Sequence, residues 1–375
     1  MTPKKREPHK LLVLSHSGVV DVNRAIYQQL ARVAEVDLTL IVPTQWAGNL
    51  ISDLSFKKTG DDKGIRVLAL PIVGSGRGSL FLYRTLLWRQ LGKWQPDTVF
   101  VDEEPWSLNA FFAFASFRKV RRVFFTKENL KRKYPPPFWL FEKFVFWQSD
   151  HAYSVAEEVT RILHDYKGYD KPIHSLPHSI DPKFFFPHTL KKKEEFKQKL
   201  GIPKEACVFS YFGRLTEEKG IRDLLTAIEK TNKDPAFSNA WYLLVGSGPL
   251  SAEVRARLPK TSTLLEAIPH HDVASTMALS DVLILPSRTT PKWKEQFGRV
   301  LIEAMACGAS VIGSDSGEIP HLIQRTGGGL IFPEGNAEEL FKQMRLLASD
   351  SEKLRGYRET GFHCVLKDLT HEAVA

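Results

Sequence analysis

The sequence has few cysteines, and those it has are isolated. Cys207, Cys307 and Cys364 are far apart, and none has a Cys or His neighbour at the spacing of a metal site. A disulfide framework and a zinc site are therefore excluded as organising features. We expect small buried thiols in a reducing compartment.

Long apolar runs are missing as well. No stretch approaches the roughly 18 apolar residues that span a bilayer. The basic N-terminus leads directly into a strand-like run, residues 11–14, without the apolar stretch and cleavage site of a secretory signal. These absences predict a cytoplasmic protein.

Acidic residues are outnumbered by basic ones. The chain has 52 Lys and Arg against 43 Asp and Glu, which gives a net charge of +9. Such a balance favours anionic partners: phosphorylated substrates, anionic lipid headgroups or nucleic acid. Because the sequence contains no recognised nucleic-acid module, we expect no nucleic-acid partner.

Basic residues are concentrated beside an aromatic-rich stretch. Thirteen aromatic side chains lie between Phe111 and Trp147, and eight Lys or Arg lie between Arg118 and Lys133. One interpretation is a peripheral contact with anionic lipid at the inner face of a membrane. The other is that the aromatics fill a domain core and the basic residues form a solvated face. The core interpretation suits the aromatics better, and an anionic partner suits the basic residues better.

The order of the elements predicts an α/β protein. Short β-branched runs alternate with longer amphipathic ones, which is typical of βαβ units and parallel sheets. The first set of predicted strands is 11–15, 38–42, 67–70, 98–101, 123–126 and 151–153. The pattern restarts with strands at 208–212, 241–245, 263–265, 282–285 and 310–313. Helical periodicity marks residues 22–34, 80–91, 221–230, 299–306 and 337–347.

A proline-rich segment separates the two sets. Residues 176–187 contain three prolines, which discourage regular structure and are typical of a linker. With 375 residues the chain is long enough for two domains. We therefore predict an N-terminal domain of residues 1–187 and a C-terminal domain of residues 188–358. Two doubly wound sheets of this kind would bind ligands at the carboxyl ends of their strands, in a cleft between the domains.

Two glycine-containing turns of the second half are candidate anion sites. In residues 212–220 a strand ends at Gly213, a loop carries Arg214 and Lys219, and a helix follows Gly220. Arg214 can bind two phosphate oxygens and Lys219 adds a mobile charge, although a solvated basic turn is the usual explanation for such a pair. The turn at Gly246 lacks the third glycine of a dinucleotide fingerprint and is equally well explained as a plain strand-to-helix turn.

The segment 293–306 is more informative. Glu295 precedes a predicted helix, Gln296 to Arg299 would present backbone N–H groups at its start, and Glu303 lies two turns further on. Carboxylates in these places can bind sugar hydroxyls and a ribose diol. A charge at Glu303, among apolar neighbours, is costly unless it is paired or ligand-bound. Glu303 alone could still be a surface acid on an amphipathic helix.

These motifs together resemble glycosyltransferase family 4. The resemblance rests on Gly-Arg-Leu…Glu-Lys-Gly at 213–220, Gly-Ser-Gly at 246–248, Pro-Ser at 286–287, Glu-x7-Glu at 295–303 and Ser-Asp-Ser-Gly-Glu-Ile-Pro at 314–320. It implies the GT-B fold: two Rossmann-like, doubly wound parallel-sheet domains that face a central cleft. It also implies that residues 359–375 return toward the N-terminal domain.

The resemblance also assigns functional residues. It implies that the donor contacts are Gly18, Gly213, Arg214, Lys219, Gly246, Ile268, Glu295, Gln296, Phe297, Gly298, Arg299 and Glu303. Arg214, Lys219 and Glu295 would be catalytic. Family members often have a His after the fourth strand, where this chain has Glu103, a residue that could orient an acceptor hydroxyl or simply belong to a polar loop.

The reaction implied is retaining transfer of a sugar from a UDP- or GDP-linked donor to a polysaccharide, lipid-linked or other glycoconjugate acceptor. No Asp-x-Asp motif is placed to hold a metal, so we expect no metal and no cofactor, and Arg214 and Lys219 would stabilise the diphosphate. The departing phosphate is the expected acceptor of the proton. Two alternatives stay open: a nucleotide-sugar epimerase of the same fold, and a catalytically weakened subunit that binds a sugar nucleotide or a membrane.

Overall fold

The computed structural model describes residues 7–34, 36–47, 54–56, 59–76, 80–84 and 95–375. It divides into unit 1, Met1–Pro177 with Val374–Ala375, and unit 2, His178–Ala373. The division falls at the start of the proline-rich segment, ten residues before the predicted boundary at 187. The predicted boundary at 358 falls inside a helix, α13 (Ser351–Asp368).

Unit 1 is built on one main sheet. Its order is β12-β11-β10-β9-β1-β2-β6-β5, and every pair is parallel except β5 with β6. The strands are β1 (Lys10–Leu14), β2 (Asp37–Pro43), β5 (Gly60–Asp62), β6 (Ile65–Leu70), β9 (Thr98–Val101), β10 (Arg121–Thr126), β11 (His151–Ser154) and β12 (Ile173–Ser175). In chain order the parallel strands run 3-2-1-4-5 across the middle of the sheet, the order of a Rossmann fold.

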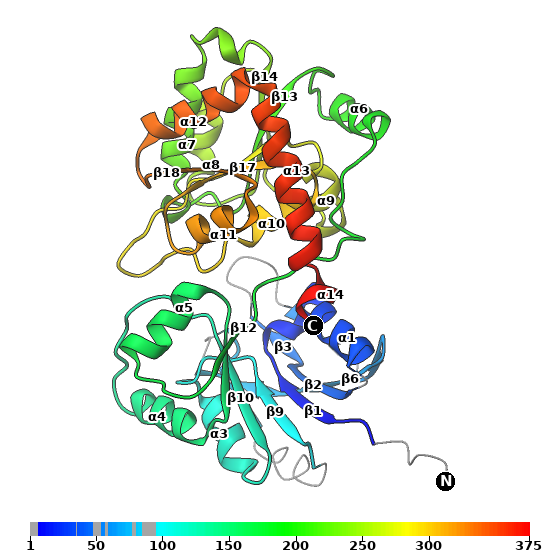
Figure 1. Ribbon diagram of the computed structural model, residues 1–375, viewed down its shortest axis with the longest axis vertical. Helices are drawn as coiled ribbons and strands as arrows, with labels where there is room; N and C mark the ends of the chain where they lie inside the picture. The colour runs from blue at the N-terminus through cyan, green and yellow to red at the C-terminus, as the bar shows by residue number, and fades with distance from the viewer. Residues whose placement is uncertain (1–6, 35, 48–53, 57–58, 77–79, 85–94) are drawn as a thin grey trace. The chain divides into compact units, whose positions relative to one another are not determined.

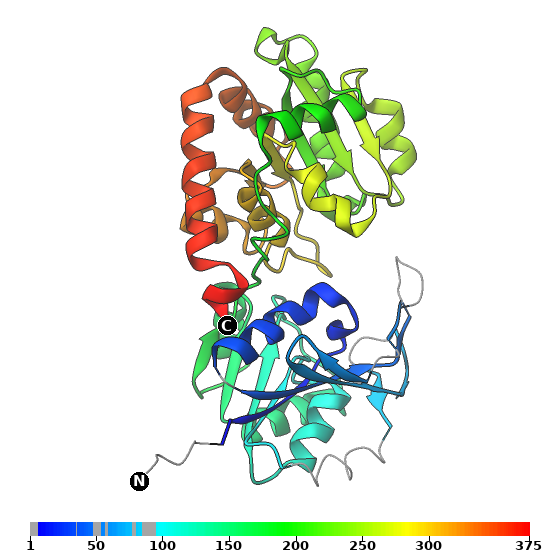
Figure 2. The ribbon, with the colours of Figure 1, turned by 90° about the vertical axis from the view of Figure 1, so that its right-hand side faces the viewer.

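Helices cover both faces of this sheet because its strands are apolar on both sides. Leu12 and Leu14 of β1 pack toward α3 (Leu108–Ser116) and α4 (Phe138–Gln148), in one buried cluster. Val13, between them, packs toward α1 (Asp21–Val33) in another. Figure 2 shows α1 and α3 on opposite faces of the sheet.

Smaller elements complete unit 1. They are η1 (Ser17–Val19), α5 (Glu157–Arg161), the π-helix η3 (Ile162–Tyr166) and two antiparallel pairs, β3 (Gln45–Trp46) with β4 (Leu54–Ser55) and β7 (Ile72–Val73) with β8 (Leu82–Tyr83).

The helix predicted at 80–91 is wrong in the part that the structure describes. Leu82 and Tyr83 form β8, and the buried Asn109 amide bonds the backbone of Phe81 and Tyr83. The strand partner and this amide satisfy the backbone groups that a helix would have paired internally. Residues 85–91 lie outside the described residues.

Unit 2 has a fully parallel sheet in the order β15-β14-β13-β16-β17-β18. Its strands are β13 (Cys207–Phe212), β14 (Ala240–Val245), β15 (Ser262–Leu265), β16 (Val282–Leu285), β17 (Ser310–Ser314) and β18 (Gly329–Phe332). Numbered from the first strand of the unit this is 3-2-1-4-5-6, again the Rossmann order. The remaining predicted strands and helices are all confirmed, with small differences at their ends.

Helices cover both faces of the unit 2 sheet (Figure 1). The helices that begin in unit 2 are α6 (Leu190–Lys199), α7 (Ile221–Thr231), α8 (Ser251–Arg257), α9 (His270–Met277), α10 (Arg299–Ala306), α11 (Ile319–Thr326), α12 (Ala337–Ser349), α13 and α14 (His371–Val374), with short turns η4 (Glu217–Lys219) and η5 (Pro235–Phe237). α7 and α12 share one buried cluster with β13 and β14, while α10, α11 and α13 contact β17.

Candidate functional site

The strand order places a ligand site in each unit. In a doubly wound sheet ligands bind where the strand order reverses, outside the carboxyl ends of the two strands that flank this point. In unit 2 these strands are β13 and β16, which are neighbours in the sheet. β13 leads into residues 213–220 and β16 into Pro286 and Ser287, so the predicted diphosphate-binding loop lies at this switch point.

Glycine lets the two loops approach closely. Gly220 has φ +68°, and a Cβ there would lie 1.7 Å from the carbonyl oxygen of Pro286. A hydrogen bond also joins the two loops: the backbone N–H of Arg288 donates to the carbonyl oxygen of Glu218 at 2.8 Å. Gly246 is equally constrained: a Cβ there would lie 1.8 Å from the carbonyl oxygen of Gly213. At Gly220 and Gly246, both predicted from the sequence, the close backbone contact leaves no room for a larger residue.

Lys219 and Glu295 form the centre of the unit 2 site. The Lys219 Nζ donates to Glu295 Oε2 at 2.7 Å, and Ser287 Oγ donates to the same oxygen at 2.8 Å. Only 17% of the Lys219 side chain and 12% of the Glu295 side chain are exposed. The ammonium also lies 4.7 Å from the ring centroid of Trp293. The group predicted to bind the diphosphate, Lys219, thus pairs with the group predicted to bind the sugar, Glu295.

Arg214 is held differently. Its Nη2 lies 3.2 Å from Glu218 Oε1, with 40% of the side chain exposed. The Tyr211 hydroxyl donates to the carbonyl oxygen of Arg214 at 2.6 Å, which fixes the backbone of the loop. Arg214 therefore presents a solvent-accessible guanidinium on the same loop as Lys219.

The second carboxylate, Glu303, is buried on α10. Only 15% of its side chain is exposed, and Arg299 Nε lies 2.9 Å from its Oε1. Burial raises the pKa of Glu303 to about 7, although Arg299 acts in the opposite direction. The alternative of a surface acid is therefore wrong.

The start of α10 is shaped by one further glycine. Gly298 has φ +81° and is the N-cap of the helix. Phe297 is buried and packs edge-on to His178, with ring centroids 5.3 Å apart. Gln296 is exposed beside it. The predicted residues 296–299 thus follow Glu295 directly, but Gln296 is open to solvent whereas Phe297 is buried.

Two predicted donor residues are not brought to this cluster by any recorded contact. Ile268 is half-buried, three residues beyond the end of β15. Gly18 belongs to unit 1, where a Cβ would lie 2.9 Å from a methyl group of Val42. Packing beneath the β1 loop accounts for Gly18 without a ligand.

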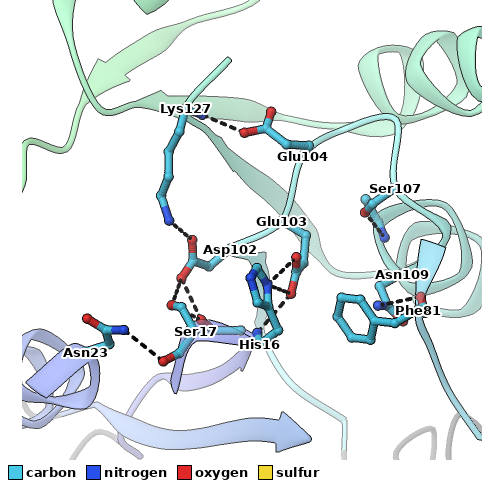
Figure 3. Close-up of polar contacts among 12 residues, drawn as sticks. His16, Ser17, Asn23, Phe81, Asp102, Glu103, Glu104, Ser107, Asn109 and Lys127 are labelled. Carbon is cyan, nitrogen blue, oxygen red and sulfur yellow. Dashed lines mark hydrogen bonds and ion pairs between the residues drawn. The ribbon is translucent and has the colours of Figure 1, made fainter. Parts of the chain in front are cut away.

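Unit 1 has its own switch point, between β1 and β9. The loop after β1 carries His16 and the loop after β9 carries Glu103 (Figure 3). His16 Nδ1 lies 2.7 Å from Glu103 Oε2, and the His16 backbone N–H donates to Glu103 Oε1 at 2.9 Å. The Glu103 side chain is 3% exposed and that of His16 is 31% exposed. Glu103 is therefore a buried partner of a histidine from another loop.

A second buried carboxylate lies beneath this pair. Asp102 accepts hydrogen bonds from Ser15 Oγ at 2.6 Å and Tyr27 OH at 3.0 Å, and Lys127 Nζ lies 3.1 Å from its Oδ1. Burial alone would raise the pKa of Asp102, but Lys127 and the Ser15 hydrogen bond outweigh it and the pKa is lowered. Asp102 and Lys127 thus form a buried ion pair, with no net charge, beneath the loop.

Glu104 has another environment. Its carboxylate accepts from Thr126 Oγ1 at 2.6 Å and from the Lys127 backbone N–H at 2.9 Å. Burial nevertheless raises the pKa of Glu104 to about 7. Three consecutive acids therefore have three roles, and only Glu103 contacts a histidine.

The basic cluster predicted between Arg118 and Lys133 is split by the structure. Exposed basic residues lie at both ends of β10, with Arg118 and Lys119 before it, Arg121 as its first residue and Lys131 to Lys133 after it. Lys127 pairs with Asp102 instead of facing a partner. The cluster is therefore not one continuous surface, because a strand runs through its middle.

The aromatic-rich stretch divides in the same way. Phe114, Phe117 and Phe124 are buried, as expected for core residues. On α4, Leu140 and Trp147 are 49% and 72% exposed. None of the helices in the described ranges is long and apolar enough to cross a membrane.

Sequence reasoning missed Ser287 and Trp293 as members of these sites, and it weighed His16 as a substrate contact or a loop residue without pairing it with Glu103. His16 and Glu103 are 87 positions apart, so no local pattern joins them. The order of the strands is the signal that could have done so, since loops after adjacent parallel strands meet at one edge.

Comparison with known families supports the assignment of both halves. Residues 192–363 match the model of "Glycosyl transferases group 1", and residues 16–184 match that of "Glycosyltransferase Family 4". Among curated proteins, the N-acetyl-alpha-D-glucosaminyl L-malate synthase of Bacillus anthracis is 27% identical over 236 residues, 62% of this chain and 59% of that protein. The 2-deoxystreptamine N-acetyl-D-glucosaminyltransferase of Streptomyces fradiae is 29% identical over 43% of this chain and 38% of that protein. The matched part is thus about half the length of these relatives.

Solved structures show the same fold over nearly the whole chain. Sucrose-phosphate synthase from Thermosynechococcus elongatus superposes with a TM-score of 0.73 at 18% identity, covering 98% of this chain and 96% of that one. Anabaena HepE in complex with UDP gives a TM-score of 0.74 at 14% identity, covering 98% and 97%. A glycosyltransferase from Rickettsia africae gives 0.76 at 17% identity, covering 98% and 96%. The GT-B fold is therefore confirmed.

Proposed function

The chain belongs to the group 1 glycosyltransferases of family 4, and we propose that it transfers a sugar, with retention, from a nucleoside-diphosphate donor to a hydroxyl acceptor. One observation carries the proposal: Lys219 and Glu295 meet at the switch point of unit 2, 2.7 Å apart. A cation for the diphosphate and a carboxylate for the sugar then lie next to each other, as the two ends of one donor require.

The leaving group is the part of the reaction that this site suits best. A departing nucleoside diphosphate develops negative charge, which Lys219 and the exposed guanidinium of Arg214 would stabilise. Backbone N–H groups of residues 296–299, before α10, would add partial positive charge near the sugar. Positive side chains thus supply the neutralisation, and we propose a reaction that needs no metal and no cofactor.

Glu295 and Glu303 would hold the donor at its two sugars. Glu295 would accept hydrogen bonds from hydroxyls of the transferred sugar once the donor has drawn Lys219 to its phosphates. Glu303, buried and with a pKa of about 7, would accept a hydrogen bond from the ribose diol. A diol gives this carboxylate further hydrogen-bond donors beside Arg299.

Our proposals for the nucleotide and the acceptor are based on what the names of similar proteins state. One solved neighbour contains UDP, and one curated relative from Corynebacterium glutamicum is named as dependent on GDP-mannose. We propose a UDP- or GDP-linked donor. The acceptor would be a glycan, a lipid-linked sugar or a related hydroxyl compound.

We also propose a peripheral contact between α4 and an anionic membrane at the cytoplasmic face. Leu140 and Trp147 are exposed and seven residues apart, which places them on one side of the helix. Lys131 to Lys133 are exposed just before α4. An apolar stripe next to basic residues is the pattern of a helix that lies at a lipid interface.

The test is a transfer assay with the full chain and a panel of UDP- and GDP-sugars, each offered with glycan, lipid-linked and small hydroxyl acceptors. We expect a glycoside whose anomeric configuration, read from the proton coupling constant of the new bond, matches that of the donor. An inverted product would refute retention. A trapped covalent glycosyl-enzyme would show that a protein side chain attacks the donor sugar first, and would refute direct attack by the acceptor hydroxyl.

A donor-only arm separates the alternatives. An epimerase would change the sugar without any acceptor, whereas the proposed transferase should not. A weakened binding subunit would bind the nucleotide and transfer to no acceptor. Loss of measured transfer in Glu295→Ala, with the fold intact by circular dichroism, would exclude that subunit.

A further inference from the structure

His16 has the geometry of a base that is oriented by a carboxylate. Its Nδ1 lies 2.8 Å and 2.7 Å from the two oxygens of Glu103. Because a carboxylate only accepts hydrogen bonds, Nδ1 must carry the proton, and a neutral His16 then has its lone pair on Nε2. In the described part of the chain Nε2 has no recorded hydrogen bond, and the ring is 31% exposed.

The ring is also fixed in place. The centroid of His16 lies 4.7 Å from that of Trp46 and 5.6 Å from that of Phe81. The His16 backbone N–H is bound to Glu103 as well, so the loop and the ring are held by one carboxylate. A preorganised ring loses little entropy when it binds a substrate, which is the usual purpose of such a clamp.

The charges around His16 favour a proton on it. Lys127 and Asp102 pair at 3.1 Å and act on His16 in opposite directions, and Glu103 is the charge that raises the pKa of the imidazole most. Trp46 and Phe81 are neutral, and the buried hydroxyl of Tyr83 has a raised pKa and stays protonated. Burial alone would lower the pKa of His16, but Glu103 and Asp102 outweigh burial and Lys127, and the pKa is raised above 6.5.

The position in the fold is the one where a ligand is expected. His16 follows β1 and Glu103 follows β9, the two strands that flank the switch point of unit 1. The pair therefore bridges the two loops that would line an acceptor site, as Figure 3 shows. A histidine that served only the core would have no need of a side chain that is 31% exposed.

We propose that His16 is a catalytic base that accepts the proton of the acceptor hydroxyl, and that Glu103 is the residue that positions it. The inference rests on the proposed glycosyl transfer and replaces the leaving phosphate as the first proton acceptor. The acceptor oxygen forms its bond to the anomeric carbon while its proton moves to Nε2. The bond from the anomeric carbon to the diphosphate breaks, and its electron pair leaves with the nucleoside diphosphate. Glu103 stabilises the imidazolium, which releases its proton to water after the product leaves.

The first experiment compares His16→Ala and His16→Asn with the wild type in the transfer assay. We expect kcat to fall by roughly 10²- to 10⁴-fold, the usual contribution of a general base, while the dissociation constant of the nucleoside diphosphate stays the same. The matched control is His164→Ala, which removes an exposed histidine whose Nδ1 lies 2.8 Å from Asp165. It should transfer at the wild-type rate.

Added imidazole gives a second readout that a structural role would not move. The cavity left in His16→Ala, between Trp46 and Phe81, has room for a free imidazole. We expect imidazole to restore part of the lost rate in this variant, and to leave His164→Ala unchanged.

The pH profile tests the role of Glu103. A base must be neutral, so kcat/KM should rise with pH through the pKa of His16, above 6.5 in the wild type. In Glu103→Gln the charge that raises the pKa of His16 is gone and burial dominates, so the midpoint of this rise should move to lower pH. His16 variants that transfer at the wild-type rate, or a midpoint that does not move in Glu103→Gln, would overturn the inference. If the wild type itself transfers nothing, the proposed function has failed instead.

Discussion

The Lys219–Glu295 ion pair leads us to predict that loss of the Glu295 charge has opposite effects on nucleotide binding and on sugar transfer. Substitution Glu295→Gln should strengthen the binding of a nucleoside diphosphate while it abolishes sugar transfer. In the structure the Glu295 carboxylate lies 2.7 Å from the Lys219 ammonium and neutralises it, and only 12% and 17% of the two side chains are exposed. A diphosphate must compete with this carboxylate for the ammonium.

The magnitude follows from the strength of such contacts. A hydrogen bond to a charged group contributes about 1.5–3 kcal/mol, and the neutral glutamine recovers part of it. A net gain of about 1–2 kcal/mol corresponds to a dissociation constant roughly 5- to 30-fold lower. For the complete nucleotide sugar the gain should be smaller, because the glutamine binds the transferred sugar less well.

The assay is isothermal titration calorimetry of UDP and GDP into the wild type and Glu295→Gln. The matched control is Glu142→Gln, which breaks a pair of similar geometry in unit 1, Lys167 to Glu142 at 2.8 Å, with side chains 8% and 13% exposed. It should leave nucleotide affinity unchanged. Equal or weaker diphosphate binding by Glu295→Gln would refute the competition.

Three other predictions concern the fold, the second carboxylate and the membrane contact. Gly220→Ala should lower the free energy of unfolding by about 2–4 kcal/mol in urea denaturation, since its φ is +68° and its Cβ would meet a carbonyl; Gly356→Ala, with open space around it in α13, should stabilise by about 0.5–1 kcal/mol. The pKa of Glu303 is about 7 in the folded protein, against an ordinary value of 4.5. The free energy of unfolding of the wild type should therefore fall relative to that of Glu303→Gln by roughly 3 kcal/mol as the pH rises from 4.5 to 7, and then level off. Parallel plots of unfolding free energy against pH for the two proteins would contradict this. Trp147→Glu should reduce sedimentation with vesicles that contain phosphatidylserine, whereas Val33→Glu, at an exposed position of α1, should not.

The sequence predicts the sheets well because nearly all their strands are parallel and both sheets are covered on two faces. β16 is a continuous apolar run that ends before Pro286, and β13, apolar apart from Ser210, ends before Gly213; these signals are local. The loop at 213–220 is predictable because its close backbone contacts need glycine at fixed positions, and this too is a local signal. α13 was not predicted, because its close contact is made by Gly361 against Gly328 and not by an apolar stripe.

The unit 1 site was harder to predict because its key contact, between His16 and Glu103, is long-range. The substitution that puts Glu103 in place of a histidine suggested a weakened site. The structure shows that this carboxylate binds His16 from the β1 loop instead. Likewise β8 depends on the buried Asn109, a partner 26 positions away that no local window contains.

The central claim is that the donor binds at the unit 2 switch point. Hydrogen–deuterium exchange of the full chain, with and without saturating UDP, GDP and their sugars, tests it directly. The account predicts slower exchange in residues 213–220 and 287–299 with the cognate nucleotide, and loss of this protection in the double variant Arg214→Ala with Lys219→Ala. Absence of protection with every nucleotide, or protection confined to other segments of the chain, would contradict it.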